Sequence, residues 1–202
     1  MKYAQQLKQT NIVTYLLYMW YVEDLIRAYG LDVERLLPSV KAHYAPEEWP
    51  KLEEWYANLC EMMRADGVTQ SGHLQILRNV VMDLTELHEA LLASPRYPFY
   101  RAAYYNALPL IVELRQKNGR KEEPELESCL GAIYGDFLLR MQQKPVSEAT
   151  TQALKTISTF LSLLTEYYHK ERRGELDRYK LDEAPQAAAQ PLREQNPTPE
   201  DK

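Results

Sequence analysis

The sequence is short of glycine, of cysteine and of charge of a single sign. It has 7 glycines and 2 cysteines in 202 residues, and its formal net charge is −5. Few glycines and few β-branched residues, beside abundant Leu, Ala, Glu and Gln, favour helices over a sheet. Because Cys60 and Cys129 lie far apart in the chain, we expect two buried free thiols rather than a disulfide. The acidic balance argues against a basic phosphate-binding patch, so we expect no nucleic-acid partner.

No hydrophobic run is long enough to cross a bilayer, which takes roughly 20 residues. The most apolar stretch extends only from Ile12 to Val22, where Thr14 alone lacks a sizeable apolar body. The segment from Met1 to Thr10 has no hydrophobic centre of the kind a signal peptide carries. We therefore expect a cytoplasmic protein without a membrane segment.

The same apolar stretch predicts a central helix. A helix that is apolar on almost every side must be covered by neighbouring helices or by lipid. This one ends in a charged cluster of Glu23, Asp24 and Arg27. We interpret it as the central helix of a soluble bundle, carrying acidic groups into a mostly apolar setting.

Prolines, glycines and capping residues divide the rest of the chain into further helices. We expect them at about 32–37, 46–66, 71–93, 98–117, 124–143 and 147–173. The predicted fold class is therefore all-α, an antiparallel bundle of six to seven helices with a hydrophobic first helix at its centre. The predicted domain covers residues 1–173. Residues 174–202 form a polar tail rich in Pro, Ala and Gln, whose composition cannot bury enough surface to order itself.

The charged cluster on the first helix is the leading candidate site. Glu23 shares the apolar stripe of this helix, so its carboxylate is expected to face inward. Arg27 is within reach of both Glu23 and Asp24, at spacings of four and three. We favour a partly buried salt bridge that helps to fix helix packing. The alternative is the polar floor of a ligand pocket with Trp20 and Tyr18 as its walls.

His88 is a second candidate, on a seam of leucines in the helix at 71–93. A histidine on an apolar stripe is more often a hydrogen-bonded core residue than a ligand. A di-metal site in a helical bundle needs two Glu-x-x-His pairs, and the chain has one, Glu166 to His169. Hydrolase, phosphate-loop and dinucleotide motifs are also missing. We therefore assign no catalytic residue, no metal and no cofactor.

Tyrosine is unusually frequent, with 15 residues. Five aromatic residues crowd around the start of one helix, namely Tyr97, Phe99, Tyr100, Tyr104 and Tyr105. They could form a protein interface, because tyrosine combines rigid apolar area with a polar tip. They could equally form the edge of a core, with each hydroxyl reaching water or a carbonyl.

The opening of the chain resembles a known family. The pattern Asn11-Ile-x-x-Tyr15-Leu-Leu-Tyr-Met-Trp20-x-x-Glu23-Asp24-Leu-Ile-Arg27 is similar to the start of domain of unknown function 4924, found in Bacteroidetes bacteria. The resemblance implies an all-helical cytoplasmic protein and supplies no activity and no catalytic residues.

Two function classes remain in competition. The favoured one is a non-enzymatic helical interaction or adaptor module that binds a protein partner or forms a homo-oligomer. The alternative is a small-molecule or metal-binding protein, which includes an enzyme, with a pocket floored by Glu23, Asp24 and Arg27. An enclosed cavity where these groups converge would support the alternative. Full pairing of the three would count against it.

Overall fold

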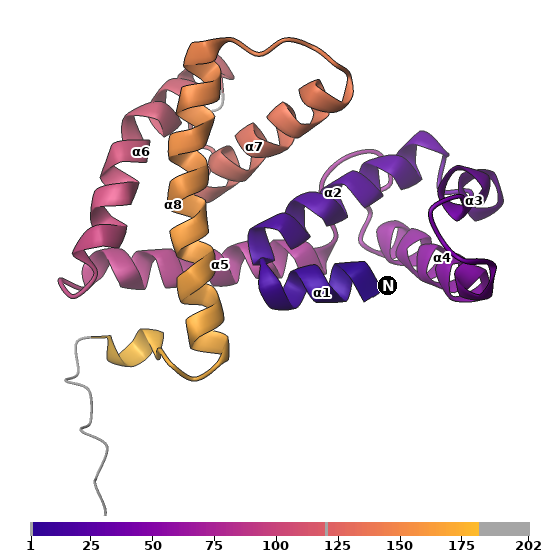
Figure 1. The fold of residues 1–202 in the computed structure, drawn as a ribbon, viewed down its shortest axis with the longest axis horizontal. Coiled ribbons are helices and arrows are strands. Elements are labelled where there is room, and N and C mark those ends of the chain that lie inside the picture. The colour runs from indigo at the N-terminus through magenta and orange to yellow at the C-terminus, as the bar shows by residue number, and fades with distance from the viewer. Residues whose placement is uncertain (1, 120, 182–202) are drawn as a thin grey trace, which may run out of the picture.

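The computed structural model describes residues 2–119 and 121–181, which form helices joined by loops (Figure 1). Within these residues there are eight α-helices, two short 3-10 helices and no strand, which confirms the predicted all-α class. The elements in chain order are α1 (Lys2–Thr10), α2 (Ile12–Ala28), α3 (Val33–Lys41), η1 (Pro46–Glu48), α4 (Trp49–Ala65), α5 (Gln75–Ala93), α6 (Pro98–Lys117), α7 (Glu125–Met141), α8 (Glu148–Arg172) and η2 (Arg178–Lys180).

One helix more than expected is present, because the chain breaks at Asn11. Asn11 is extended, with φ −155° and ψ 96°. Its side chain accepts a hydrogen bond of 2.9 Å from the backbone N–H of Thr14, which is the geometry of a helix N-cap. The chain therefore turns at Asn11, and α1 packs beside α2 rather than extending it (Figure 1).

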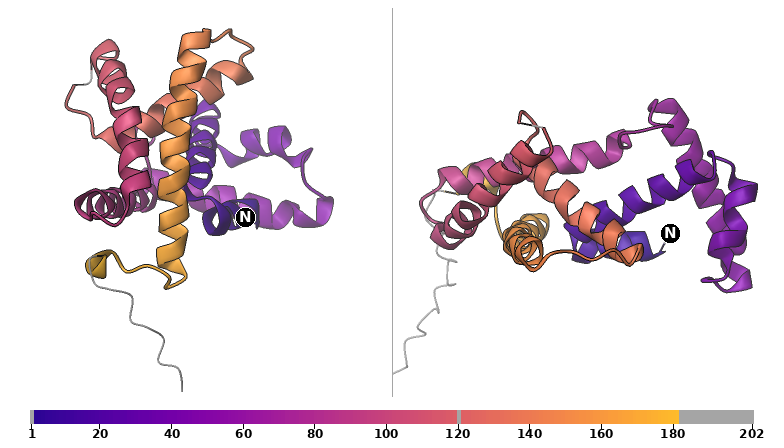
Figure 2. Two further views of the ribbon diagram at one scale, coloured as in Figure 1. Left: turned by 60° about the vertical axis from the view of Figure 1, so that its left-hand side comes forward. Right: turned by 90° about the horizontal axis from the view of Figure 1, so that it is seen from above.

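The helices cross at several angles. The helices α6 and α8 run antiparallel and side by side, α5 crosses them, and α7 packs against both (Figures 1 and 2). The helices α3 and α4 form a separate pair at the other end of the molecule. Because α2 contacts α3 as well as α7 and α8, it links the two ends.

The burial of α2 agrees with its apolar sequence. Ile12, Leu16 and Ile26 are fully buried, and Glu23 is buried among them. Removing one such aliphatic side chain from water stabilises the fold by roughly 1.5–3 kcal/mol. Nowhere in residues 2–119 and 121–181 does a helix combine the length and apolarity needed to cross a membrane.

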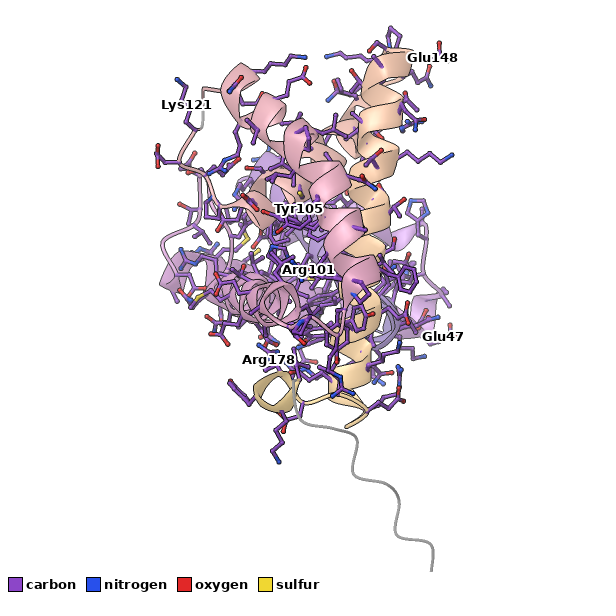
Figure 3. All side chains as sticks on the ribbon, turned by 90° about the vertical axis from the view of Figure 1, so that its left-hand side faces the viewer. Glu47, Arg101, Tyr105, Lys121, Glu148 and Arg178 are labelled. Carbon is purple, nitrogen blue, oxygen red and sulfur yellow. The ribbon has the colours of Figure 1, made fainter. Side chains whose placement is uncertain are left out.

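The last described segment, residues 174–181, packs against the helical body. Composition, in contrast, predicts that all of residues 174–202 belong to the tail. Arg178, the first residue of η2 (labelled in Figure 3), donates through Nη1 to the backbone carbonyl of Asp83 on α5 at 3.0 Å. Its guanidinium, 7% exposed, pairs with Asp83 at 2.7 Å and also with Glu171. Leu181 is buried as well. Residues 174–181 thus belong with the helical body, and the remainder of the expected tail, 182–202, lies outside the described residues.

Candidate functional site

The predicted residues Trp20, Glu23, Asp24 and Arg27 lie together on α2, facing the loop that joins α4 to α5. Glu23 is only 1% exposed. One of its carboxylate oxygens, Oε1, accepts a hydrogen bond of 2.8 Å from the backbone N–H of Leu74. The other, Oε2, is 2.6 Å from Nδ1 of His73. Both oxygens therefore have partners, which offsets the cost of burying a carboxylate.

His73 completes this arrangement. Its ring stacks on the indole of Trp20, with centroids 4.2 Å apart and planes 13° apart, while about a third of the side chain, 34%, stays exposed. The sequence places His73 within the helix expected at 71–93, at an exposed position with no role. The helix begins only at Gln75, so His73 lies in the preceding loop, where helical periodicity could not indicate its partners.

Asp24 and Arg27 form the second half of the cluster. Arg27 Nη1 donates to Asp24 Oδ1 at 2.8 Å, and the hydroxyl of Tyr134 on α7 donates to Asp24 Oδ2 at 2.6 Å. The guanidinium of Arg27 also donates to two loop carbonyls, Val68 O at 3.1 Å and Gly72 O. Burial, together with the bond to Asp24, raises the pKa of Tyr134, which keeps this hydroxyl a donor.

The cluster holds the loop 66–74 in place through hydrogen bonds and determines where α5 begins. We predicted that this helix begins at Ser71, whereas it begins at Gln75. Its first backbone N–H groups are bound by carboxylates from elsewhere. Leu74 donates to Glu23, and Gln75 donates to Asp66 at 2.7 Å. Two carboxylates at a helix N-terminus satisfy free donors and complement the helix dipole.

His88, the fifth predicted residue, is not part of this cluster. It lies fifteen positions beyond His73, roughly 20 Å along α5. His88 is buried, and its Nδ1 is 2.6 Å from the hydroxyl of Tyr100. The rings of Tyr104 and Phe160 contact its ring edge to face. Burial lowers the pKa of His88 to about 4, so it is neutral at pH 7. This is the environment of a hydrogen-bonded core histidine.

The aromatic group at the start of α6 divides between core and surface. Tyr100 and Tyr104 are buried, and the hydroxyl of Tyr104 donates to Glu125 at 2.8 Å. Phe99 and Tyr105 are exposed by 83% and 55%, and Figure 3 shows Tyr105 on α6 one turn beyond Arg101. The exposed tyrosine surface is therefore smaller than the sequence suggests.

No group of three or more His, Cys, Asp or Glu side chains is arranged to hold a metal ion in the part of the chain that the structure describes. Cys60 and Cys129 are buried free thiols, as we predicted. Burial raises the pKa of the Cys129 thiol to about 12, so it stays protonated and unreactive at neutral pH.

A groove runs along α1, between this helix and a wall made by α2, α4, α5 and α8. It consists of three hollows of about 540, 310 and 580 Å³. The first two share the lining residues Gln5, Trp55 and Asn58, and the second and third share Lys8. The shared residues place the three hollows next to one another along α1, and together they are called the α1 groove below.

The α1 groove is apolar in the middle and charged at its ends. The middle is lined by Tyr15, Met19, Leu59, Met62 and Ile76 among others. The end beside α8 is lined by Lys8, Arg172 and Arg173 together with Asp83. Arg172 pairs with Asp83 and Arg173 with Glu175, so this end has a small positive balance. The end beside η1 is lined by Glu47, Glu48 and Glu54 together with Lys2 and Lys51, a negative balance.

Comparison with known proteins identifies the family of the chain and no individual relative. No curated protein and no solved structure is significantly similar to it. A family model described as domain of unknown function (DUF4924) matches residues 1–175, a range that contains all eight α-helices and ends just before η2. This confirms the resemblance seen at the opening of the sequence, and the chain belongs to the DUF4924 family.

Proposed function

We propose that this protein is a non-enzymatic interaction module that binds a segment of a partner protein in the α1 groove. The observation that carries the proposal is the row of three adjoining hollows along α1, with an apolar middle between two ends of opposite charge. Grooves of this kind accept amphipathic helices, whose apolar face enters the groove and whose flanking charges set the direction.

The charges at the two ends indicate which segment would fit. At the α8 end Arg172 pairs with Asp83 and Arg173 with Glu175, and Lys8 adds a further positive charge, so the segment carries an acidic residue there. At the η1 end three glutamates face two lysines, so it carries basic residues at its other end. The nine residues of α1 extend for about 13 Å along this groove. A helical segment of about three turns, with an apolar stripe between an acidic and a basic end, fits these features.

The alternative function has less support. A pocket at Glu23, Asp24 and Arg27 would need these groups to be available to a ligand. Each of them already bonds to another group of the protein, namely His73, Leu74, Tyr134 and the loop carbonyls. Their arrangement favours a structural role for the cluster.

The proposal is tested in two steps: the partner segment is identified, and its affinity for the protein is then measured. A photo-crosslinking amino acid at Asn58, inside the groove, identifies the partner segment in cells, and a synthetic peptide of that segment is titrated onto the purified protein. Ile76→Glu places a charge on the groove wall at a side chain that is 44% exposed. Met82→Glu, on the same helix at a side chain 59% exposed and outside the groove lining, is the control.

We expect Ile76→Glu to weaken peptide binding at least tenfold, because a carboxylate would be desolvated against the apolar face of the peptide. Met82→Glu should bind like the unmodified protein. Equal affinity for both variants, or crosslinks to peptides without the apolar stripe and the two charged ends, would refute the proposal.

A further inference from the structure

Asp83 on α5 binds two arginines that belong to different parts of the molecule. Its Oδ2 accepts a hydrogen bond from Nη2 of Arg172, and both residues line the α1 groove at its α8 end. Its Oδ1 accepts from Nη2 of Arg178 at 2.7 Å. Arg178 belongs to η2 and does not line any of the three hollows. One carboxylate therefore connects the wall of the groove to the segment 174–181.

Arg178 is well placed to balance the charge of Asp83. Its side chain is only 7% exposed, so water and salt screen this ion pair less than an exposed one. Arg178 also donates through Nη1 to the backbone carbonyl of Asp83 at 3.0 Å, and through Nε to Glu171 at 2.6 Å. Several charge-assisted hydrogen bonds thus hold the guanidinium beside the Asp83 carboxylate.

Arg172 presents its guanidinium to the groove. Its side chain is 57% exposed, and the guanidinium lies over the ring of Tyr168, 5.0 Å from the ring centroid. Tyr168 lines the same end of the groove. A guanidinium has five N–H donors, so Arg172 can bind a second carboxylate while it still pairs with Asp83. The second carboxylate is bound more strongly when another cation balances Asp83, because two carboxylates on one guanidinium repel each other.

We infer that Arg178 is a positioning residue for the α1 groove: by pairing with Asp83, it leaves Arg172 available to bind a carboxylate of the partner segment. This inference rests on the proposed function and names the chemistry of the α8 end, a side-chain carboxylate held by Arg172. Without Arg178, Asp83 would be balanced by Arg172 alone, and this end of the groove would lose its positive balance. The family model matches residues 1–175, so the control comes from a segment outside the matched range.

The first test needs no partner and uses phenylglyoxal, which reacts with guanidinium groups that no carboxylate holds. Mass spectrometry of peptides measures the rate at Arg172, with the exposed Arg35 on α3 as the reference in the same protein. We expect Arg178→Ala to slow the reaction at Arg172 at least threefold, because Asp83 then pairs with Arg172 alone. Adding Asp83→Asn to Arg178→Ala should restore the rate, because it removes the carboxylate that holds Arg172.

The matched control adds Glu86→Gln to Arg178→Ala. Glu86 also pairs with Arg178, at 3.3 Å, but among the described residues it has no ion pair with Arg172 and does not line the groove. The reaction at Arg172 should therefore stay slow in this protein. Circular dichroism checks that the variants keep their helices. An equal rate at Arg172 with and without Arg178, or a slow rate that Asp83→Asn does not restore, would overturn the inference.

The same four proteins are then titrated with the peptide identified by crosslinking at Asn58. Arg178→Ala should weaken binding at least fivefold, and Asp83→Asn should restore it, as a double-mutant cycle would show. A purely structural role of Arg178 predicts no such rescue, because Asp83→Asn removes one more anchor of η2.

The two proposals fail in different ways. Unchanged affinity of Arg178→Ala for a peptide whose binding Ile76→Glu does weaken would overturn this inference alone. Failure of the proposed function would appear instead as equal binding by Ile76→Glu and the unmodified protein, an outcome on which the phenylglyoxal rates do not depend.

Discussion

At the scale of single residues, Glu23 has the most consequential environment. Its carboxylate is buried in a helix that is otherwise apolar, and it holds both an imidazole and a backbone N–H of another segment. Removing one partner of such a group is costly, because the other partners are left buried and unpaired. The role of Glu23 can therefore be measured as stability.

We predict that Glu23→Ala lowers the free energy of unfolding by about 2–4 kcal/mol, because the Leu74 N–H and His73 lose their acceptor. Urea denaturation measures the change, with Glu89→Ala on the exposed side of α5 as the control, which should change stability by less than about 0.5 kcal/mol. If melting were unchanged and a bound ligand were lost instead, the cluster would be a binding site rather than a structural one.

His88 makes stability depend on pH. Its pKa is lowered to about 4 in the folded state, mainly by burial, whereas an unfolded histidine titrates near 6.5. Between these two values the unfolded chain binds more protons than the folded chain, so acidification favours unfolding. The stabilisation is fully present above about pH 6.5 and is lost progressively as the pH falls toward 4.

We expect this histidine to account for a loss of roughly 2–3 kcal/mol between pH 7 and pH 4.5. The measurement is the unfolding free energy at both pH values in the unmodified protein and in His88→Gln, which cannot titrate. The variant should be less stable at pH 7 but should lose less on acidification. An identical pH dependence of the two proteins would rule out His88 as the responsible group.

At the scale of elements, helix starts differ in how well they can be predicted. The start of α8 follows from Ser147, whose hydroxyl accepts from the N–H of Thr150 three residues later. The start of α5 does not, because its caps are Glu23 and Asp66, distant in sequence. A local cap can be recognised from neighbouring residues, whereas a cap supplied by another helix exists only once the chain has folded.

The element η2 shows the same limit. Composition placed residues 174–181 in the tail, yet Arg178 anchors them through carboxylates of α5 and α8. The side-chain bonds to Glu171 and Asp83 raise the pKa of Arg178, so it stays cationic. This ion-pair network, together with the buried Leu181, holds a mostly polar segment against the helical body.

We predict that Arg178→Ala releases η2, because Asp83 and Glu171 lose their shared partner. Limited proteolysis should then cut within residues 174–181 several times faster than in the unmodified protein. Lys180→Ala, at a side chain 61% exposed, serves as the control and should be cut at the original rate. Unchanged cleavage of Arg178→Ala would mean that other contacts hold this segment.

At the scale of the whole molecule, the α1 groove is bounded by helices from both ends of the chain. Its middle is lined by α1, α2, α4 and α5, and its α8 end by α1, α5 and α8. A partner segment bound there would therefore contact helices that are distant from one another in the sequence.

The all-α class, the apolar character of α2 and the family could all be predicted from the amino-acid sequence, because they depend on composition, periodicity and a local string of residues. The sequence also brought Trp20, Glu23, Asp24 and Arg27 together, since residues on one side of a helix stay neighbours in any fold.

The contacts that these residues make with other elements could not be predicted in this way. His73, Leu74 and Tyr134 reach the cluster from other elements, and His88 turns out to lie far along α5 from it. The groove likewise needs α1 to fold back at Asn11 beside helices that follow much later in the chain. Contacts between distant segments depend on how the helices pack, and helical periodicity carries no information about which helix will be the neighbour.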